Sequence, residues 1–110
     1  MSIEAAFFPQ ATVNIAATTI SQNVALPATT LGPYQTADGD SVLIYNSGAT
    51  IAFVEFGGNN SVVASPLLSM PIPPGMSRLI GCGQYVSFVA AIMLTGTGTI
   101  YFSRGKGHNY

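Results

Sequence analysis

Charged residues are scarce in this chain. Only 6% of its 110 residues are Asp, Glu, Lys or Arg, whereas a typical soluble domain has about 25%. Polarity is supplied by Ser, Thr, Asn and Gln instead. The formal net charge of -1 gives no electrostatic attraction to nucleic acid or to anionic lipid. We therefore expect neither of these as a partner.

Cysteine and histidine each occur once. A single cysteine, Cys82, excludes an intrachain disulfide and slightly favours a reducing site of synthesis. His108 lies between two small residues near the C-terminus, where we expect no packed shell to hold its imidazole in place. Because a thiol or hydroxyl nucleophile needs a well-positioned base, we predict no catalytic residue and no enzymatic activity.

Acidic residues number four, and only Asp38 and Asp40 are close in sequence. These two aspartates lack the further ligands of an EF-hand loop, so a turn is favoured over a calcium site. Gly96-Thr97-Gly98 lacks the helix N-terminus that a phosphate-binding loop needs, and it is predicted to be a hairpin turn. The sequence thus predicts no metal ion and no cofactor.

Long apolar runs are missing as well. The longest, Tyr85 to Leu94, is half of the roughly 20 residues that a bilayer-spanning helix needs. The N-terminal segment has Glu4 where a signal peptide would carry basic residues. We expect neither a membrane span nor an export signal.

Short segments rich in β-branched and aromatic residues are present instead, and turn formers separate them. The clearest pair is Val42–Tyr45 and Ile51–Phe56, which flank Asn46-Ser47-Gly48 and predict a β-hairpin over Asp40–Gly57. Further strands are expected in two parts of Ala11–Leu26 and at Tyr34–Thr36, Ser61–Ala64, Arg78–Ile80, Gln84–Leu94 and Thr99–Ser103. The prolines of Met70–Gly75 exclude a central strand there.

This pattern supports no helix of three turns. It predicts an all-β chain, an antiparallel β-sandwich with jelly-roll-like connections, as one domain over residues 1–110. Residues 1–10 are expected to form an extended arm, because Phe7-Phe8-Pro9 follows no strand periodicity. Residues 104–110 are expected to form a glycine-rich C-terminal tail.

Unprotected strand edges are a second consequence of the missing charge. All-β proteins usually guard their edges with lysine, inward charges or bulges, and this chain has one lysine. The edges and apolar faces of the predicted hairpin must therefore be covered by the fold or by other subunits, which predicts a homo-oligomer. Glu55, between two apolar residues, is expected either to face solvent, which is favoured, or to pair with a cation at an interface.

Three segments resemble parts of short virion proteins encoded in tailed-phage structural gene clusters: V-L-I-Y-N-S-G-A-T-I-A-F-V-E-F-G, M-P-I-P-P-G and G-T-G-T-I-Y-F-S-R-G-K-G. The resemblance covers roughly Ser41 to Gly107, and small capsid decoration or cement proteins are the nearest functional class. It implies a jelly-roll-like subunit, a dimer or trimer, made in the host cytoplasm and located on the capsid surface. There it would clamp the major capsid protein or other virion subunits together.

The candidate interface residues are aromatic and charged side chains of the arm, the hairpin and the tail. They are Phe7, Phe8, Tyr45, Glu55, Arg104, Lys106 and Tyr110. The few cations of the tail would bind nucleic acid only weakly, so protein contacts are favoured. The alternative hypothesis is a small phage tail or head-fibre module that recognises host surface carbohydrate through Tyr34, Tyr45 or Tyr101.

Overall fold

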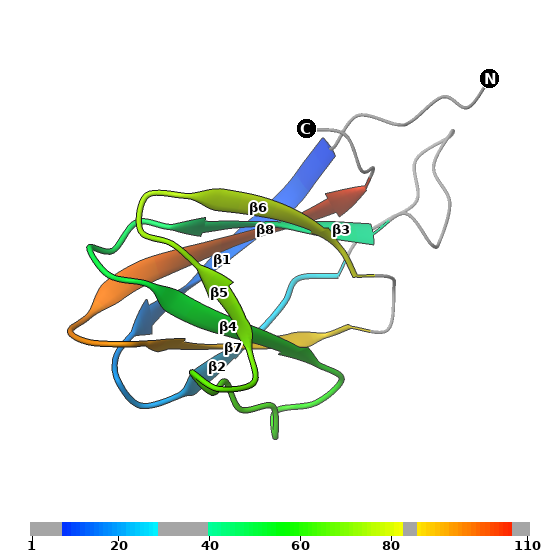
Figure 1. The fold of residues 1–110 in the computed structure, drawn as a ribbon. Helices are drawn as coiled ribbons and strands as arrows, with labels where there is room; N and C mark the ends of the chain where they lie inside the picture. The colour runs from blue at the N-terminus through cyan, green and yellow to red at the C-terminus, as the bar shows by residue number, and fades with distance from the viewer. Residues whose placement is uncertain (1–7, 29–39, 83–85, 107–110) are drawn as a thin grey trace.

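The structure is a computed structural model that describes residues 8–28, 40–82 and 86–106. These residues form eight β-strands in two antiparallel sheets of four strands each, and no helix. Figure 1 shows the two sheets as the layers of a sandwich. The prediction of an all-β chain with an antiparallel β-sandwich is confirmed.

The first sheet has the strand order β1-β8-β3-β6, and the second has the order β2-β7-β4-β5. The strands of the first sheet are β1 (Phe8–Ala17), β8 (Gly98–Lys106), β3 (Asp40–Asn46) and β6 (Ser77–Gly81). The strands of the second sheet are β2 (Gln22–Ala25), β7 (Phe88–Met93), β4 (Ala52–Gly57) and β5 (Met70–Ile72).

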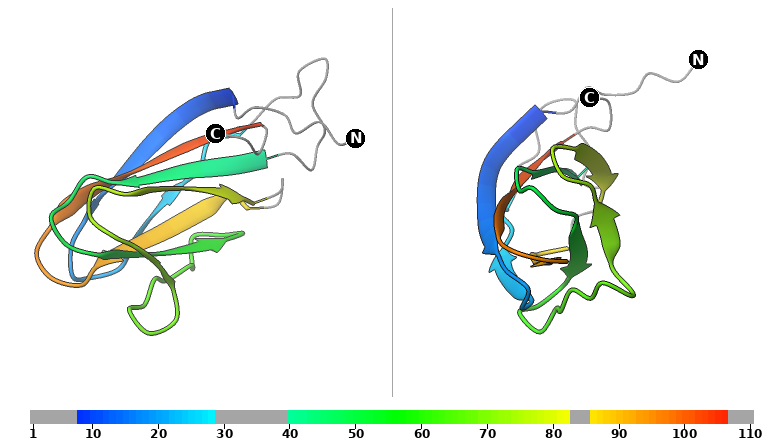
Figure 2. Two further views of the ribbon diagram at one scale, coloured as in Figure 1. Left: turned by 45° about the horizontal axis from the view of Figure 1, so that its top comes forward. Right: turned by 60° about the vertical axis from the view of Figure 1, so that its left-hand side comes forward.

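The chain changes sheet at almost every connection. Among consecutive strands of the described chain, only β4 and β5 belong to the same sheet. The right-hand view of Figure 2 shows β1 and β2 on one side of the sandwich and β5 and β6 on the opposite side. As a result, β8, β3, β7 and β4 lie inside their sheets, and their edges are covered by the fold itself.

The hairpin predicted over Asp40–Gly57 is wrong in its pairing. Both strands exist, but β3 pairs with β8 and β6, whereas β4 pairs with β7 and β5. The connection between β3 and β4 is therefore an arch from one sheet to the other. Gly96-Thr97-Gly98 also joins the two sheets, so its prediction as a hairpin turn is wrong as well.

Two glycines let these arches meet. A Cβ atom added to Gly98 would lie only 2.8 Å from the Cα atom of Gly48. Such a distance is shorter than a real Cβ contact, so a side chain at Gly98 would push the two backbones apart. The glycine that suits a hairpin turn is needed here for close backbone approach between arches.

Asn46 holds the first arch in place. Its side chain is fully buried. Its Nδ2 donates hydrogen bonds of 2.9 Å to the carbonyl oxygens of Thr50 and Ile72, and its Oδ1 accepts one of 2.9 Å from the N–H of Gly48. Because Ile72 belongs to β5, one side chain of the first sheet is bonded to the backbone of the second.

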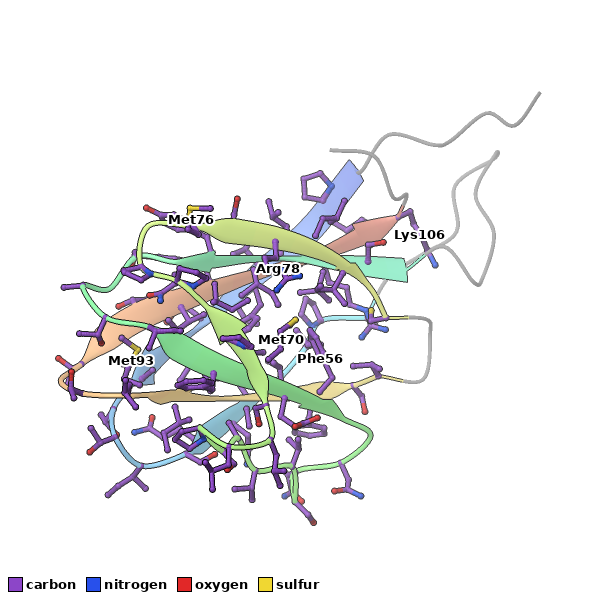
Figure 3. All side chains as sticks on the ribbon, viewed as in Figure 1. Phe56, Met70, Met76, Arg78, Met93 and Lys106 are labelled. Atoms are coloured by element: carbon purple, nitrogen blue, oxygen red, sulfur yellow. The ribbon has the colours of Figure 1, made fainter. Side chains whose placement is uncertain are left out.

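The core lies between the sheets and follows strand alternation. Ile100 and Phe102 are fully buried, which confirms the inward face predicted for the last strand. Phe56, Met70 and Met93, labelled in Figure 3, contribute from the second sheet. The fully or almost fully buried apolar side chains include Ile15, Ala17, Val42, Ile44, Ala52, Val54, Ile72, Val89, Ala91, Met93, Ile100 and Phe102.

The remaining strand, arm and tail predictions have different outcomes. Met70–Ile72 forms an edge strand, in agreement with the exclusion of a central strand. Ser61–Ala64 forms no strand, because its backbone turns and then follows an irregular path. Arm residues 8–10 belong to β1, and tail residues 104–106 belong to β8. The strand predicted at Tyr34–Thr36 lies outside the described residues.

Candidate docking surfaces

Titratable side chains are dispersed over the described part of the chain. Within residues 8–28, 40–82 and 86–106, no group of three or more His, Cys, Asp or Glu side chains is placed to hold a metal ion. Cys82 is half-buried and packs against the core. A shallow depression is lined by small neutral residues: Ala16, Ala17, Thr18, Thr97, Gly98 and Thr99. None of these groups is an acid or base near neutral pH.

No helix in the described residues is long and apolar enough to cross a membrane. His108 lies outside the described residues. Asp38 does too, so the predicted aspartate turn is not described as a whole.

Arg104 and Lys106, expected in a docking tail, are buried. Their exposed fractions are 4% and 3%. Both lie on β8 at positions that strand alternation directs inward, as it does Phe102. Arg104 Nη1 donates a hydrogen bond to the carbonyl oxygen of Val86. The tail prediction is wrong for these residues because R-G-K continues the strand alternation. Little of either side chain is left for contact with a partner.

The remaining arm and tail candidates are only partly described. Phe8 begins β1, where its backbone is opposite Lys106 of β8. Phe7 and Tyr110 lie outside the described residues. A docking role for these three aromatic residues stays a prediction.

The outer face of the second sheet is covered by residues 58–69, the connection between β4 and β5, which we call the cover. Asn23 Nδ2 on β2 donates a 3.0 Å hydrogen bond to the carbonyl oxygen of Asn60. The N–H of Ala64 donates one of 2.9 Å to Ser21 Oγ, and Ala64 is buried. The cover is therefore fastened to the sheet by polar contacts at several points.

At one end of the cover, a turn at Ser65–Ser69 points two leucines into solvent. The exposed fractions of Leu67 and Leu68 are 92% and 86%. The carbonyl oxygen of Ser65 accepts hydrogen bonds from the N–H groups of Leu68 (3.3 Å) and Ser69 (2.9 Å). The turn, which we call the leucine turn, is thus closed by backbone hydrogen bonds without burial of its leucines.

Glu55 anchors the leucine turn to β4. The N–H of Ser65 donates a 2.8 Å hydrogen bond to Ser69 Oγ, and that hydroxyl donates one of 3.0 Å to Glu55 Oε1. Glu55 is half-buried. Glu55, expected to face solvent or to meet a partner's cation, lies on the outer face of its sheet and also accepts a hydrogen bond from its own chain.

Further exposed apolar side chains lie near the cover. Val63 is on the cover itself, and Ile20 precedes Ser21, which is bonded to Ala64; both Val63 and Ile20 are exposed. Soluble monomers rarely expose large contiguous apolar patches without a binding role. None of these residues was predicted to be part of a site, although S-P-L-L-S in an irregular segment offers two leucines no strand in which to be buried.

The outer face of the first sheet is of a different kind. Tyr45 and Tyr101 are neighbours on β3 and β8, with ring centroids 6.4 Å apart and ring planes at 23°. Their exposed fractions are 42% and 39%. The hydroxyls of Thr12 and Ser103 share a 2.8 Å hydrogen bond on strands β1 and β8. This face combines exposed aromatic rings with hydroxyl groups.

No family model matches the chain, and no curated protein sequence matches it. The fold and surfaces define a class: an all-β sandwich with a tyrosine-bearing sheet face and an exposed leucine turn. These two surfaces are the candidate docking sites of the described residues.

Proposed function

We propose that this protein is a non-enzymatic structural subunit of a tailed-phage virion, a decoration or cement protein on the capsid surface. Its partners are the major capsid protein or other virion subunits. The leucine turn is the observation that carries the proposal. Leu67 and Leu68 are almost fully exposed on a hydrogen-bonded turn, so their apolar surface leaves water only when a partner covers it.

The energy of this contact fits a repeated structural role. Burying one leucine contributes about 1.5–3 kcal/mol, while association costs an estimated 4–15 kcal/mol in lost freedom. Two leucines alone therefore give weak attachment of a single copy. A symmetric shell repeats the contact many times, and a protein that bridges subunits gains from several contacts at once.

The strand pairing supports a jelly-roll fold for this subunit. The first strand pairs with the last and the others follow inward: β1 with β8, β2 with β7, β3 with β6 and β4 with β5. One antiparallel ribbon of these four pairs, wound so that alternate pairs fall in alternate sheets, produces the observed strand orders. Viral capsid proteins are among the users of jelly rolls, as are lectins.

The second candidate is a tail or head-fibre module that binds host surface carbohydrate, and the exposed Tyr45 and Tyr101 favour it. Their exposed fractions of 42% and 39% leave less than half of each tyrosine accessible to a sugar. Strand alternation places no charged residue at the outward positions of the described first sheet, so the carboxylates common in sugar sites are missing there. The decoration role is therefore the first choice.

Co-sedimentation with capsids that lack this protein tests the proposal. We expect wild-type protein to sediment with the capsids, and a Leu67→Ser/Leu68→Ser variant to bind about tenfold or more weakly, equivalent to about 1.4 kcal/mol. Leu94→Ser is the matched control, because Leu94 is also exposed but lies outside the leucine turn. We expect that variant to bind like wild type.

Three results would contradict the decoration role. They are absence of wild-type protein from the capsid pellet at saturation, equal weakening by Leu94→Ser, and full binding by the double variant. Binding of the wild-type protein to host glycans, lost in Tyr45→Ala and Tyr101→Ala, would establish the carbohydrate module instead.

A further inference from the structure

The four strand edges of the sandwich differ in their protection. β5 has Pro71 at its centre, β6 carries Arg78, and β2 has only four residues. Proline, charge and short length are the usual means of preventing a new strand from pairing with an edge. β1 is an edge strand of ten residues without a charged side chain, and its one proline, Pro9, lies near its N-terminal end. It is therefore the edge best suited to accept another strand.

The usable part of β1 is Ala11–Ala17. In the described sheet, the strand beside β1 is β8, and their register shifts between Pro9 and Ala11 but is regular from Ala11 to Ala17. In an antiparallel pair, alternate residues direct their N–H and C=O groups away from the partner. Along this segment, β1 thus presents a row of backbone groups on its far edge.

The side chains of this segment also suit strand pairing. Thr12, Val13 and Ile15 are β-branched, which favours extended backbone. Thr12 and Asn14 are exposed on the outer face, while Ile15 is buried on the inner face. A neighbouring strand must therefore keep the same inner and outer faces as β1.

We infer that β1 pairs in antiparallel fashion with β1 of a second copy, joining two first sheets into one continuous sheet. A two-fold axis perpendicular to the sheet keeps the outer faces of both copies on the same side. Such an axis brings like residues near one another, and like charges opposite each other destabilise a strand pair. Ala11–Ala17 contains no charge, so self-pairing carries no such cost.

The adjoining edge of the second sheet supports a second copy as the occupant. β2 lies on the same side of the sandwich as β1 in the right-hand view of Figure 2. Its residues, Gln22–Ala25, are uncharged, so that side of the described sandwich has no charged strand residue to meet its own copy. Standard interfaces bury about 800 Å² per partner, and β2 adds to the area that β1 provides. This inference does not depend on the virion role.

Sedimentation velocity across the micromolar range tests the pairing. We expect wild-type protein to approach twice the 11.4 kDa mass of one chain. Asn14→Lys and, separately, Ala16→Lys place a cation at exposed positions of β1 and should return the protein to one chain. Ser77→Lys is the matched control, since Ser77 is exposed on β6 at the opposite edge of the same sheet. It should dimerise like wild type.

Amide hydrogen exchange identifies the edge involved. The backbone amides of Ala11–Ala17 should exchange more slowly in the dimer than after dilution, and Asn14→Lys should remove that concentration dependence. A wild-type chain that sediments at 11.4 kDa throughout would overturn the inference. So would a trimer, a dimer that survives both lysine variants, or a dimer that Ser77→Lys disrupts equally. Capsid binding by monomeric Asn14→Lys would show that the decoration role is separate from dimerisation.

Discussion

The two sheets share one core, yet their outer faces differ in composition and in exposure to solvent. The second sheet has apolar outward positions such as Phe53 and Ile92, and its Ala90 is fully buried beneath the chain. At the outward positions of the first sheet, Tyr45, Tyr101, Thr12 and Asn14 are exposed, while Leu43 and Leu79 are half-buried and Ser41 is buried. The chain thus covers the apolar face of its second sheet itself. The most exposed leucines, Leu67 and Leu68, therefore lie on the cover and not on the sheet.

The largest effect should come from a charge beneath the cover. Ala90→Asp places a carboxylate at a fully buried outward position, directly opposite Glu55 on β4. Burial of an uncompensated charge beside a like charge costs several kcal/mol, so we expect a loss of about 3 kcal/mol or more in the free energy of unfolding. Urea denaturation followed by circular dichroism measures this loss.

Ala16→Asp is the matched control on the outer face of the first sheet, which we call the bare face. Ala16 is an exposed outward residue of β1, and the same substitution there should change the free energy of unfolding by about 0.5 kcal/mol or less. Both variants should be compared at a protein concentration too low for association. Equal losses for the two variants would show that the outer faces do not differ in cover.

The second prediction concerns the place where the two sheets are joined. Asn46→Ala removes the acceptor of the Gly48 N–H and the donor to the carbonyl oxygen of Ile72. Buried polar groups left without partners cost about 1–3 kcal/mol each, so we expect a loss of about 2–4 kcal/mol in urea unfolding. Asn59→Ala is the control, because Asn59 Oδ1 accepts a similar 2.9 Å bond from Ser61 N–H on the surface. A loss for Asn59→Ala as large as that for Asn46→Ala would remove the special role of burial.

Most strand positions were predictable from the sequence, whereas strand partners were not. Val42–Tyr45 and Ile51–Phe56 carry β-branched and aromatic residues, and β3 and β4 lie there. Asn46-Ser47-Gly48 suits a tight hairpin and an arch equally, because both need a turn-forming amide and a small residue. The arch is set by pairing with strands distant in sequence, which also brings Asn46 to the backbone of Ile72, and no local pattern reports these contacts.

The errors at Arg104 and Lys106 have one physical cause. Glycines beside Arg104 and Lys106 indicated a tail, but the alternation of Ile100 and Phe102 continues through both cations. Long side chains can bury their aliphatic stems at the end of a sandwich, so a charged residue does not by itself end a strand. Parity with the preceding core residues was the signal available in the sequence.

The candidate surfaces were predictable in part. Tyr45 was selected for its place on a strand, and it is exposed. The leucine turn was missed because exposure of Leu67 depends on the bonds that Ser65, Ser69 and Glu55 make across the cover. Residue type alone assigns leucine to the interior. Only the cover's path over the second sheet shows that these leucines have no interior to enter.

The smallest effect concerns the bare face. A double-mutant cycle with Tyr45→Ala and Tyr101→Ala should give a coupling of about 0.5–1 kcal/mol in urea unfolding, because cross-strand aromatic pairs attract beyond their burial. Thr12→Ala with Tyr45→Ala is the control cycle: β8 separates these strands, so their effects should add within about 0.5 kcal/mol. A coupling of zero between the tyrosines would mean that each ring is ordered independently at 6.4 Å. The bare face would then be stable through its hydroxyl contacts alone, and both rings would be free to turn toward a partner.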